Sequence, residues 1–225
     1  MLRAFFIEVT PMKLSVKKMV LIAMLAAAAY IIVFLVRIPV VLFLKYEPKD
    51  VIITIGGFLL GPMAAFIVSA IVSLVEMISI SGTGPIGCLM NLLSTCSFAC
   101  VASLIYKREH TLTGAIKGLC LGSAMMVAVM LLWNWVVTPL YMGVERSVVE
   151  GMLLPAFLPF NLLKAGLNSA LTLFLYKPLV SALRKTGLVE SHGTHKGRSK
   201  VGVYLFAAVL LVTCILLLLV FQGKL

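Results

Sequence analysis

Residues 158–168 read LPFNLLKAGLN, and this stretch opens an apolar run that continues to Tyr176. The run is long enough to cross a membrane as a helix, yet it contains Lys164. A charged side chain inside a span costs about 2.5–3.5 kcal/mol on insertion scales. The spacing of Asn161, Lys164 and Asn168 places all three on one stripe of the predicted helix.

This polar stripe has two interpretations. In the first, Lys164 snorkels, with its aliphatic stem in lipid and its ammonium group at the interface. In the second, the stripe faces a ligand held inside the protein. The two asparagines on the same face favour the ligand site, because amides need polar partners that lipid does not supply.

The composition of the whole chain also indicates a membrane protein. Of the 225 residues, 62% are hydrophobic and only 12% are charged, and the mean hydropathy is +1.14. A soluble fold cannot bury so much apolar surface, so we predict an all-α polytopic membrane protein with the lipid bilayer as a partner. The net charge of +11 fits basic cytoplasmic loops, and no pattern typical of nucleic-acid binding accompanies it.

The order of apolar runs predicts a division of the chain. We expect a cytoplasmic N-terminal segment over residues 1–19 and a six-helix substrate-binding unit over residues 20–183. A basic cytoplasmic linker over residues 184–200 then leads to an extra transmembrane helix over residues 201–221. Lysines and arginines fall in the same set of loops, which predicts a cytoplasmic N-terminus.

The stretch 51–80 is too long for one crossing and contains a single charge, Glu76. Gly61-Pro62 offers a break, and the distribution of basic residues favours two crossings, the first short or tilted. The side chain of Glu76 either faces the membrane interface or pairs with a group in a pocket.

The remaining outer segments are predicted as loops and an aromatic belt. Residues 37–50 have a hydrophobic middle and are expected to fold back over the bundle, and residues 143–151 are expected to form an outer loop. Trp133 and Tyr141 either lie among lipid headgroups or stack on a ligand.

The motifs of several membrane enzymes are missing from the sequence. It contains neither a Gly-x4-Gly-Lys-Ser/Thr phosphate loop nor a His-Glu-x-x-His pair. The chain is therefore expected not to be an enzyme, and any ATP hydrolysis that it uses is expected to come from another subunit.

Several separated segments resemble the substrate-binding S components of energy-coupling factor (ECF) vitamin transporters, in particular the riboflavin-binding type. The resemblance covers about residues 17–185. It is carried by Asp50 with the Ile55-Gly56-Gly57-Phe58 and Gly61-Pro62 segments, by Pro85-Ile86-Gly87 with Asn91, by Trp133-Asn134 with Pro139-Leu140-Tyr141-Met142, and by Pro159-Phe160-Asn161 with Lys164.

The resemblance implies a bundle open to the outside, with riboflavin beneath the first loop. The ring system would lie between the fourth, fifth and sixth helices, its edge read by Asn134, while Asn161 and Lys164 would hold polar atoms of the ligand. Residues 45–50 would close over it. The substrate-binding residues expected on this basis are Asn134, Asn161, Lys164, Asp50, Tyr46, Gly87, Asn91 and Trp133.

The resemblance also implies partners. Ala23 and Ala27 form a small-xxx-small pair that matches the family's docking site for a transmembrane coupling subunit driven by two ATP-binding subunits. The whole S component is thought to topple in the bilayer of the bacterial plasma membrane, and no cofactor is expected, since riboflavin is the transported ligand.

Two departures from the family pattern leave alternatives open. Residues 46–50 differ from the usual first loop, and the helix over residues 201–221 is additional. One alternative is the same scaffold binding another vitamin or heterocycle. A second is a membrane-embedded enzyme or assembly scaffold whose polar stripe packs against a partner helix.

Overall fold

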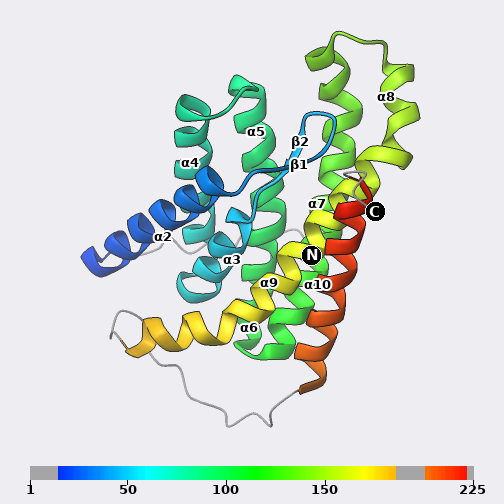
Figure 1. Ribbon diagram of the computed structural model, residues 1–225. Helices are drawn as coiled ribbons and strands as arrows, with labels where there is room; N and C mark the ends of the chain where they lie inside the picture. Colours follow the sequence, from blue (N-terminus) through cyan, green and yellow to red (C-terminus); the bar gives the residue numbers. More distant parts are fainter. Residues whose placement is uncertain (1–14, 186–200, 222–225) are drawn as a thin grey trace.

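The computed structural model describes residues 15–185 and 201–221 as a bundle of helices with a β-hairpin across one end (Figure 1). Within these residues, six helices are long and apolar enough to cross a membrane, which confirms the predicted all-α polytopic fold. The helices are α2 (Val16–Leu35), α3 (Lys49–Leu60), α4 (Pro62–Ser79), α5 (Gly84–Thr95), α6 (Val101–Glu109), α7 (Leu112–Met142), α8 (Arg146–Met152), α9 (Leu158–Lys185) and α10 (Val201–Phe221).

The predicted segment boundaries are described only in part. Helix α2 begins at Val16, earlier than the predicted start at residue 20, because the Ser15 side chain accepts a hydrogen bond from the Lys18 amide at 3.4 Å. Most of the predicted N-terminal segment, residues 1–14, and most of the predicted linker, residues 186–200, lie outside the described residues.

The predicted break at Gly61-Pro62 is confirmed. Gly61 has a φ of 98°, a conformation that favours glycine, and Pro62 lies in the first turn of α4, where no amide donor is needed. Helix α3 has 12 residues, about 18 Å at about 1.5 Å per residue. It is shorter than a bilayer core and is mostly buried within the bundle.

Helices α5 and α6 form one continuous span, joined by a π-helical turn over Cys96–Cys100. This span packs tightly against α7: a Cβ atom added at Gly118 would lie 2.5 Å from the carbonyl oxygen of Ala102. Small residues allow such an approach between membrane helices. Helix α7 begins after a Thr111 cap and ends at Met142, where Gly143 takes the left-handed conformation.

Two segments predicted as loops have regular structure. Residues 38–46 form an antiparallel hairpin of β1 (Ile38–Val41) and β2 (Leu44–Tyr46), in which Ile38 pairs with Tyr46. Burial alternates along β2, where Leu44 and Tyr46 are buried and Lys45 is exposed. The predicted outer loop 143–151 is also corrected, because most of it belongs to α8.

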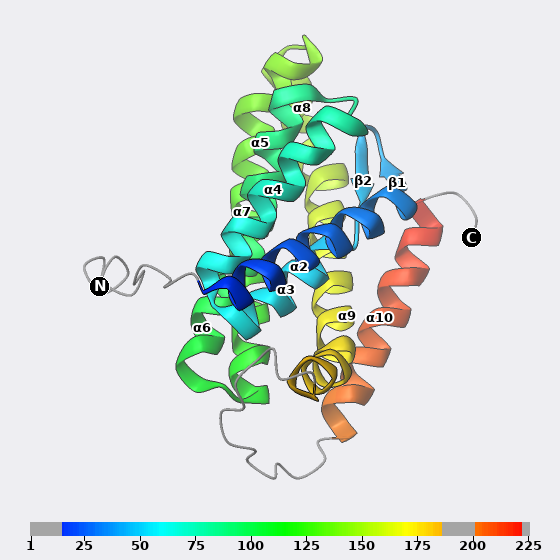
Figure 2. The same cartoon turned by 90° about the vertical axis from the view of Figure 1, so that its left-hand side faces the viewer.

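The hairpin lies at the same end of the molecule as α8 and the C-terminal end of α10 (Figures 1 and 2). Two apolar clusters hold the bundle together: a large one centred on α2, α4, α6 and α7, and a smaller one at the hairpin. We call the smaller one the outer cluster. Its buried members are Val40, Leu44, Tyr46, Val149, Phe157, Phe160, Leu163, Leu167, Cys214 and Leu218.

Candidate ligand site

The hairpin leads directly into α3, whose first turn carries Asp50, a fully buried carboxylate. Its Oδ1 accepts a hydrogen bond from Thr95 Oγ1 at 2.6 Å, and its Oδ2 accepts one from Asn168 Nδ2 at 3.0 Å. The ammonium of Lys164 lies 3.3 Å from the same Oδ2. The start of a helix also favours a negative charge. Asp50 therefore joins α3 to α5 and α9.

The polar stripe of α9 faces inward as predicted, with Asn161, Lys164 and Asn168 all buried. The Lys164 ammonium donates to Ser94 Oγ at 3.1 Å and lies beside Asp50, inside the bundle. This position contradicts the snorkelling interpretation. Tyr46 donates from its hydroxyl to Asn168 Oδ1 at 3.1 Å, so the stripe also holds the hairpin. We call this group the Asp50 cluster: Tyr46, Asp50, Ser94, Thr95, Lys164 and Asn168.

A second buried group, the Glu76 cluster, also lies at the N-terminus of α3. Lys49, which is 1% exposed, donates to Glu76 Oε2 at 2.6 Å and to Glu47 Oε2 at 2.8 Å. Asn91 Nδ2 donates to Glu76 Oε2 at 2.9 Å. Of the two interpretations of Glu76, the structure supports pairing with a buried group.

Arg37 completes the Glu76 cluster at the start of the hairpin. Its Nε donates to Glu47 Oε1 at 2.8 Å, and its Nη1 donates to the carbonyl oxygen of Ile80 at 2.7 Å. Both ends of the hairpin are therefore anchored by charged groups. Buried ion pairs are costly to break, because the remaining partner is left as an uncompensated buried charge.

Contacts at the end of the hairpin shift the pKa values of two residues, Glu47 and Tyr46. Burial alone would raise the pKa of Glu47, but the nearby charges of Lys49, Lys164 and Arg37 outweigh it and hold that pKa below its ordinary value. Burial raises the pKa of Tyr46 well above its ordinary value, and Asp50 adds to the effect. Tyr46 therefore remains a hydroxyl donor to Asn168.

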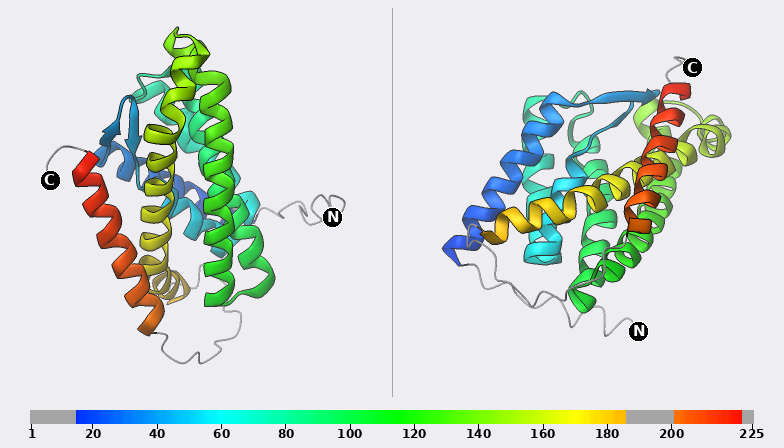
Figure 3. Two further views of the ribbon diagram at one scale, coloured as in Figure 1. Left: turned by 90° about the vertical axis from the view of Figure 1, so that its right-hand side faces the viewer. Right: turned by 60° about the horizontal axis from the view of Figure 1, so that its bottom comes forward.

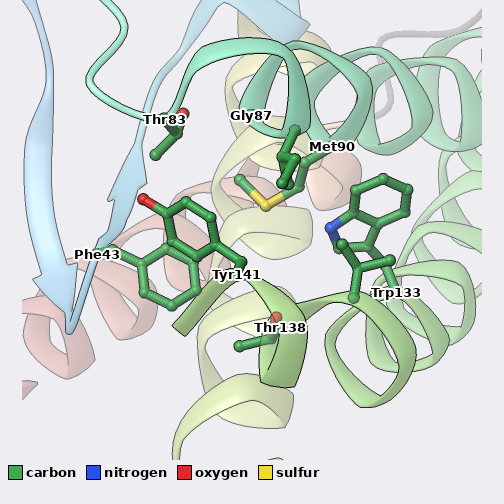
Figure 4. Close-up of a pocket in the computed structure, with 9 residues that line it drawn as sticks. Phe43, Thr83, Gly87, Met90, Trp133, Thr138 and Tyr141 are labelled. Atoms are coloured by element: carbon green, nitrogen blue, oxygen red, sulfur yellow. The ribbon is translucent and has the colours of Figure 1, made fainter. Parts of the chain in front are cut away.

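A small hollow lies between the hairpin tip, the start of α5 and the end of α7; its cavity volume is about 10 Å³, within about 250 Å³ of empty space that is partly open to solvent. Three aromatic rings, those of Phe43, Trp133 and Tyr141, stand on its walls (Figure 4). The rings of Phe43 and Tyr141 meet edge to face at 5.5 Å between centroids. We call it the ring pocket. Its lining residues are Phe43, Thr83, Ile86, Gly87, Met90, Trp133, Val137, Thr138 and Tyr141.

The two predicted amide groups make mainly local contacts. Asn134 is fully buried and donates to the carbonyl oxygen of Met130 at 2.7 Å. Its Oδ1 accepts from the Thr138 hydroxyl at 2.9 Å, so Asn134 is connected to the ring pocket through Thr138. Asn161 donates to the carbonyl oxygen of Phe157 at 2.8 Å. Each amide thus bonds to the carbonyl one turn earlier.

The predicted site residues fall into separate groups. Gly87 and Trp133 line the ring pocket, Tyr46, Asp50 and Lys164 form part of the Asp50 cluster, and Asn91 belongs to the Glu76 cluster. Ala23 and Ala27 are exposed on α2, outside all three groups.

Sequence reasoning missed Phe43, Thr95 and Thr138, and it placed Glu47 and Lys49 in the covering segment without their buried ion pairs. For the charged residues a signal existed: the polar run 45–50 directly precedes an apolar helix. That run resembles a solvated loop unless its buried partners on α4, α5 and α9 are known.

Together these features define a multi-pass membrane protein that holds ion pairs in its interior and has an aromatic pocket beneath a hairpin. The chain belongs to the family described as ECF transporter, substrate-specific component, whose model matches residues 17–176. It is accordingly a transporter component and not an enzyme.

Curated relatives and a solved structure agree with this assignment. The chain is 27% identical to the riboflavin transporter RibU of Staphylococcus aureus (strain TCH60) over 178 residues, which cover 75% of this chain and 93% of RibU. It is 27% identical to the riboflavin transporter FmnP of Bacillus subtilis (strain 168), with 67% and 85% covered. A solved S component of a bacterial ECF transporter superposes with a TM-score of 0.65 and 28% identity, covering 75% of this chain and 98% of that one.

Proposed function

We propose that this chain binds riboflavin at the outer face of a bacterial plasma membrane and delivers it inward as the S component of an ECF importer. Membership of the S component family supports transport. The two relatives named as riboflavin transporters support this ligand over other vitamins. The family also favours transport over the alternative of a membrane scaffold.

The observation that carries the proposal is the ring pocket. Riboflavin combines a flat, aromatic ring system with a polyhydroxyl chain, and the pocket offers aromatic faces from Phe43, Trp133 and Tyr141 beside the hydroxyls of Thr83 and Thr138. Aromatic side chains stack favourably on flat heterocycles, while a few placed polar groups fix their orientation.

The remaining predicted residues have roles that follow from their contacts. Asn134 would act on the ring edge through or beside Thr138. Asn161 would contribute its amide oxygen, for which no donor is found in the part of the chain that the structure describes. Lys164 would bind a polar atom of the ligand while it remains paired with Asp50. Tyr46 would keep the hairpin closed over the ligand, and Gly87 and Asn91 would shape the α5 side.

Coupling would use an exposed face of α2. Ala23 and Ala27 are exposed on α2, which is compatible with close approach of a transmembrane coupling subunit carrying two ATP-binding subunits. We place the N-terminus in the cytoplasm on the distribution of basic residues. The substrate-binding unit would comprise residues 20–183, the linker residues 184–200 and the extra helix residues 201–221.

The test is a visible absorption and fluorescence spectrum of detergent-purified protein, followed by riboflavin titration. We expect either a flavin spectrum of the purified protein or quenching of added riboflavin. Quenching should be lost or weakened in Asn134→Ala and Lys164→Ala and retained in Lys117→Ala, whose exposed ion pair with Glu109 lies outside the site. Absence of both signals would exclude riboflavin, and a titration series with other vitamins would then identify the ligand.

A further inference from the structure

Helix α10 is an addition to the family unit. The family match ends at residue 176, and the S. aureus relative is covered over 93% of its own length by only 75% of this chain. Helix α10 (Val201–Phe221) therefore lies beyond the matched residues and calls for a separate explanation.

This helix packs along α9, the helix that carries the polar stripe (Figure 3). Near one end, the rings of Phe174 and Tyr204 lie 6.4 Å apart between centroids. Midway, a Cβ atom added at Gly166 would lie 2.7 Å from Cys214 Sγ, so the two helices meet where α9 has no side chain. Such close contact along the helix indicates a fixed position against the bundle rather than a loose tether.

At its C-terminal end, α10 reaches the hairpin. Cys214 and Leu218 are 5% and 9% exposed, and they pack in the outer cluster with Val40, Leu44 and Tyr46 of the hairpin. Helix α10 contacts β1 directly, and Figure 2 shows the two side by side. The hairpin is thus held between the ion-paired interior on one side and α10 on the other.

The same hairpin covers the site. Phe43 at its turn lines the ring pocket, and Tyr46 at its end donates to Asn168 in the Asp50 cluster. We propose that α10 supports the hairpin by packing against it and so keeps it closed over the site; we call this support the buttress. Cys214 and Leu218 are its positioning residues, and they slow release of the ligand. The identity of the ligand rests on the proposed function, whereas the support of the hairpin does not.

Amide hydrogen exchange of the full-length protein in lipid nanodiscs tests the support without any ligand. Leu218→Ala should speed exchange of the hairpin amides, residues 38–46, by about tenfold, because it removes buried contacts in the outer cluster. The matched control is Leu217→Ala, whose side chain is 47% exposed and should leave that exchange unchanged. Equal effects of the two variants, or no effect of Leu218→Ala, would overturn the proposal.

A rescue experiment separates a buttress from general destabilisation. Gly166→Ala places a methyl group against Cys214 Sγ, so it should displace α10 and speed hairpin exchange. Adding Cys214→Ala removes that sulfur, and the methyl group introduced on α9 takes up the space that it leaves, so amide exchange of the hairpin should return toward the wild-type rate. A double variant that exchanges as fast as Gly166→Ala alone would argue against the role of this contact.

Ligand release provides the second measurement. Riboflavin dissociation, followed by recovery of fluorescence after dilution, should be faster in Leu218→Ala than in Leu217→Ala. If Leu218→Ala speeds amide exchange of the hairpin but neither variant nor wild type binds riboflavin, the proposed ligand is wrong and the support of the hairpin by α10 still holds. If riboflavin binds and dissociates at the same rate from both variants, α10 does not control ligand release.

Discussion

The Nζ atom of Lys164 on α9 lies 3.3 Å from Oδ2 of Asp50 on α3, with 7% and 0% of the two side chains exposed. A lysine that sequence alone leaves between lipid and protein therefore has a defined partner inside the bundle. The same carboxylate accepts hydrogen bonds from Thr95 and Asn168, so removal of Lys164 leaves a buried charge that is only partly compensated.

We expect Lys164→Met to weaken riboflavin binding by roughly 30-fold or more, the effect of losing about 2 kcal/mol or more when one member of a buried pair is truncated. Fluorescence titration measures the change. Lys117→Met is the control, because its pair with Glu109 is exposed and worth little. A Kd that is equal in both variants would mean that Lys164 serves only the fold.

Trp133 and Trp135 provide a matched comparison for the aromatic interpretation. Trp133 lines the ring pocket, whereas Trp135 donates to Glu150 at 2.9 Å and lies 4.9 Å beneath the Arg146 guanidinium carbon. Trp133→Leu should weaken binding about two- to tenfold, since ring stacking adds about 0.5–1.5 kcal/mol to the apolar contact. Trp135→Leu should bind normally. Equal losses would favour a general role of both rings at the membrane interface.

The lowered pKa of Glu47 predicts how the hairpin responds to acid. A carboxylate with a depressed pKa in the folded state stabilises that state above its unfolded pKa of about 4.3, and the effect disappears as pH falls through the lower folded pKa. Between about pH 7 and pH 5, the Tm of Glu47→Gln should therefore be lower than that of wild type by a constant amount.

Thermal unfolding at a series of pH values measures this difference in Tm, which should shrink only below about pH 4.3. The cations that face Glu47 are Lys49, Lys164 and Arg37, and the carboxylate of Glu76 binds the same Lys49 ammonium. If the difference in Tm already disappears near neutral pH, these cations do not hold Glu47 in its charged form.

Docking of the coupling subunit is expected to depend on the small residues of α2. Ala23→Leu with Ala27→Leu should abolish uptake of riboflavin in proteoliposomes that contain the complete importer, because the larger side chains prevent close helix contact. Binding by the isolated chain should not change. Met24→Leu, at another exposed position of α2, is the control. Normal uptake by the double variant would place the docking surface elsewhere.

Helix positions and the inward polar stripe were predictable because they depend on local periodicity. The break at Gly61-Pro62 and the shared face of Asn161, Lys164 and Asn168 both follow from spacing and turn chemistry. The hairpin was predicted as a loop, since its two strands are short and their pairing depends on the bundle beneath them.

The partners of the charged residues were not predictable in the same way. Lys49 lies next to Asp50 in sequence, yet the two belong to different clusters and pair with Glu76 and Lys164 respectively. Those pairings join residues from separate helices, and no local pattern contains them. The ring pocket was likewise predicted only in part, because Phe43 enters it from the hairpin turn.

The interior also has an electrical consequence. Counted by formal charge, Arg37, Lys49 and Lys164 contribute three positive charges and Glu47, Asp50 and Glu76 three negative ones, so the formal sum is zero. Each uncompensated charge carried across 100 mV would involve about 2.3 kcal/mol of electrical work. Under the proposed function, a neutral vitamin carried by a reorienting bundle would move across the membrane without any net charge from these six groups. The membrane voltage would therefore neither drive nor oppose that movement through these groups.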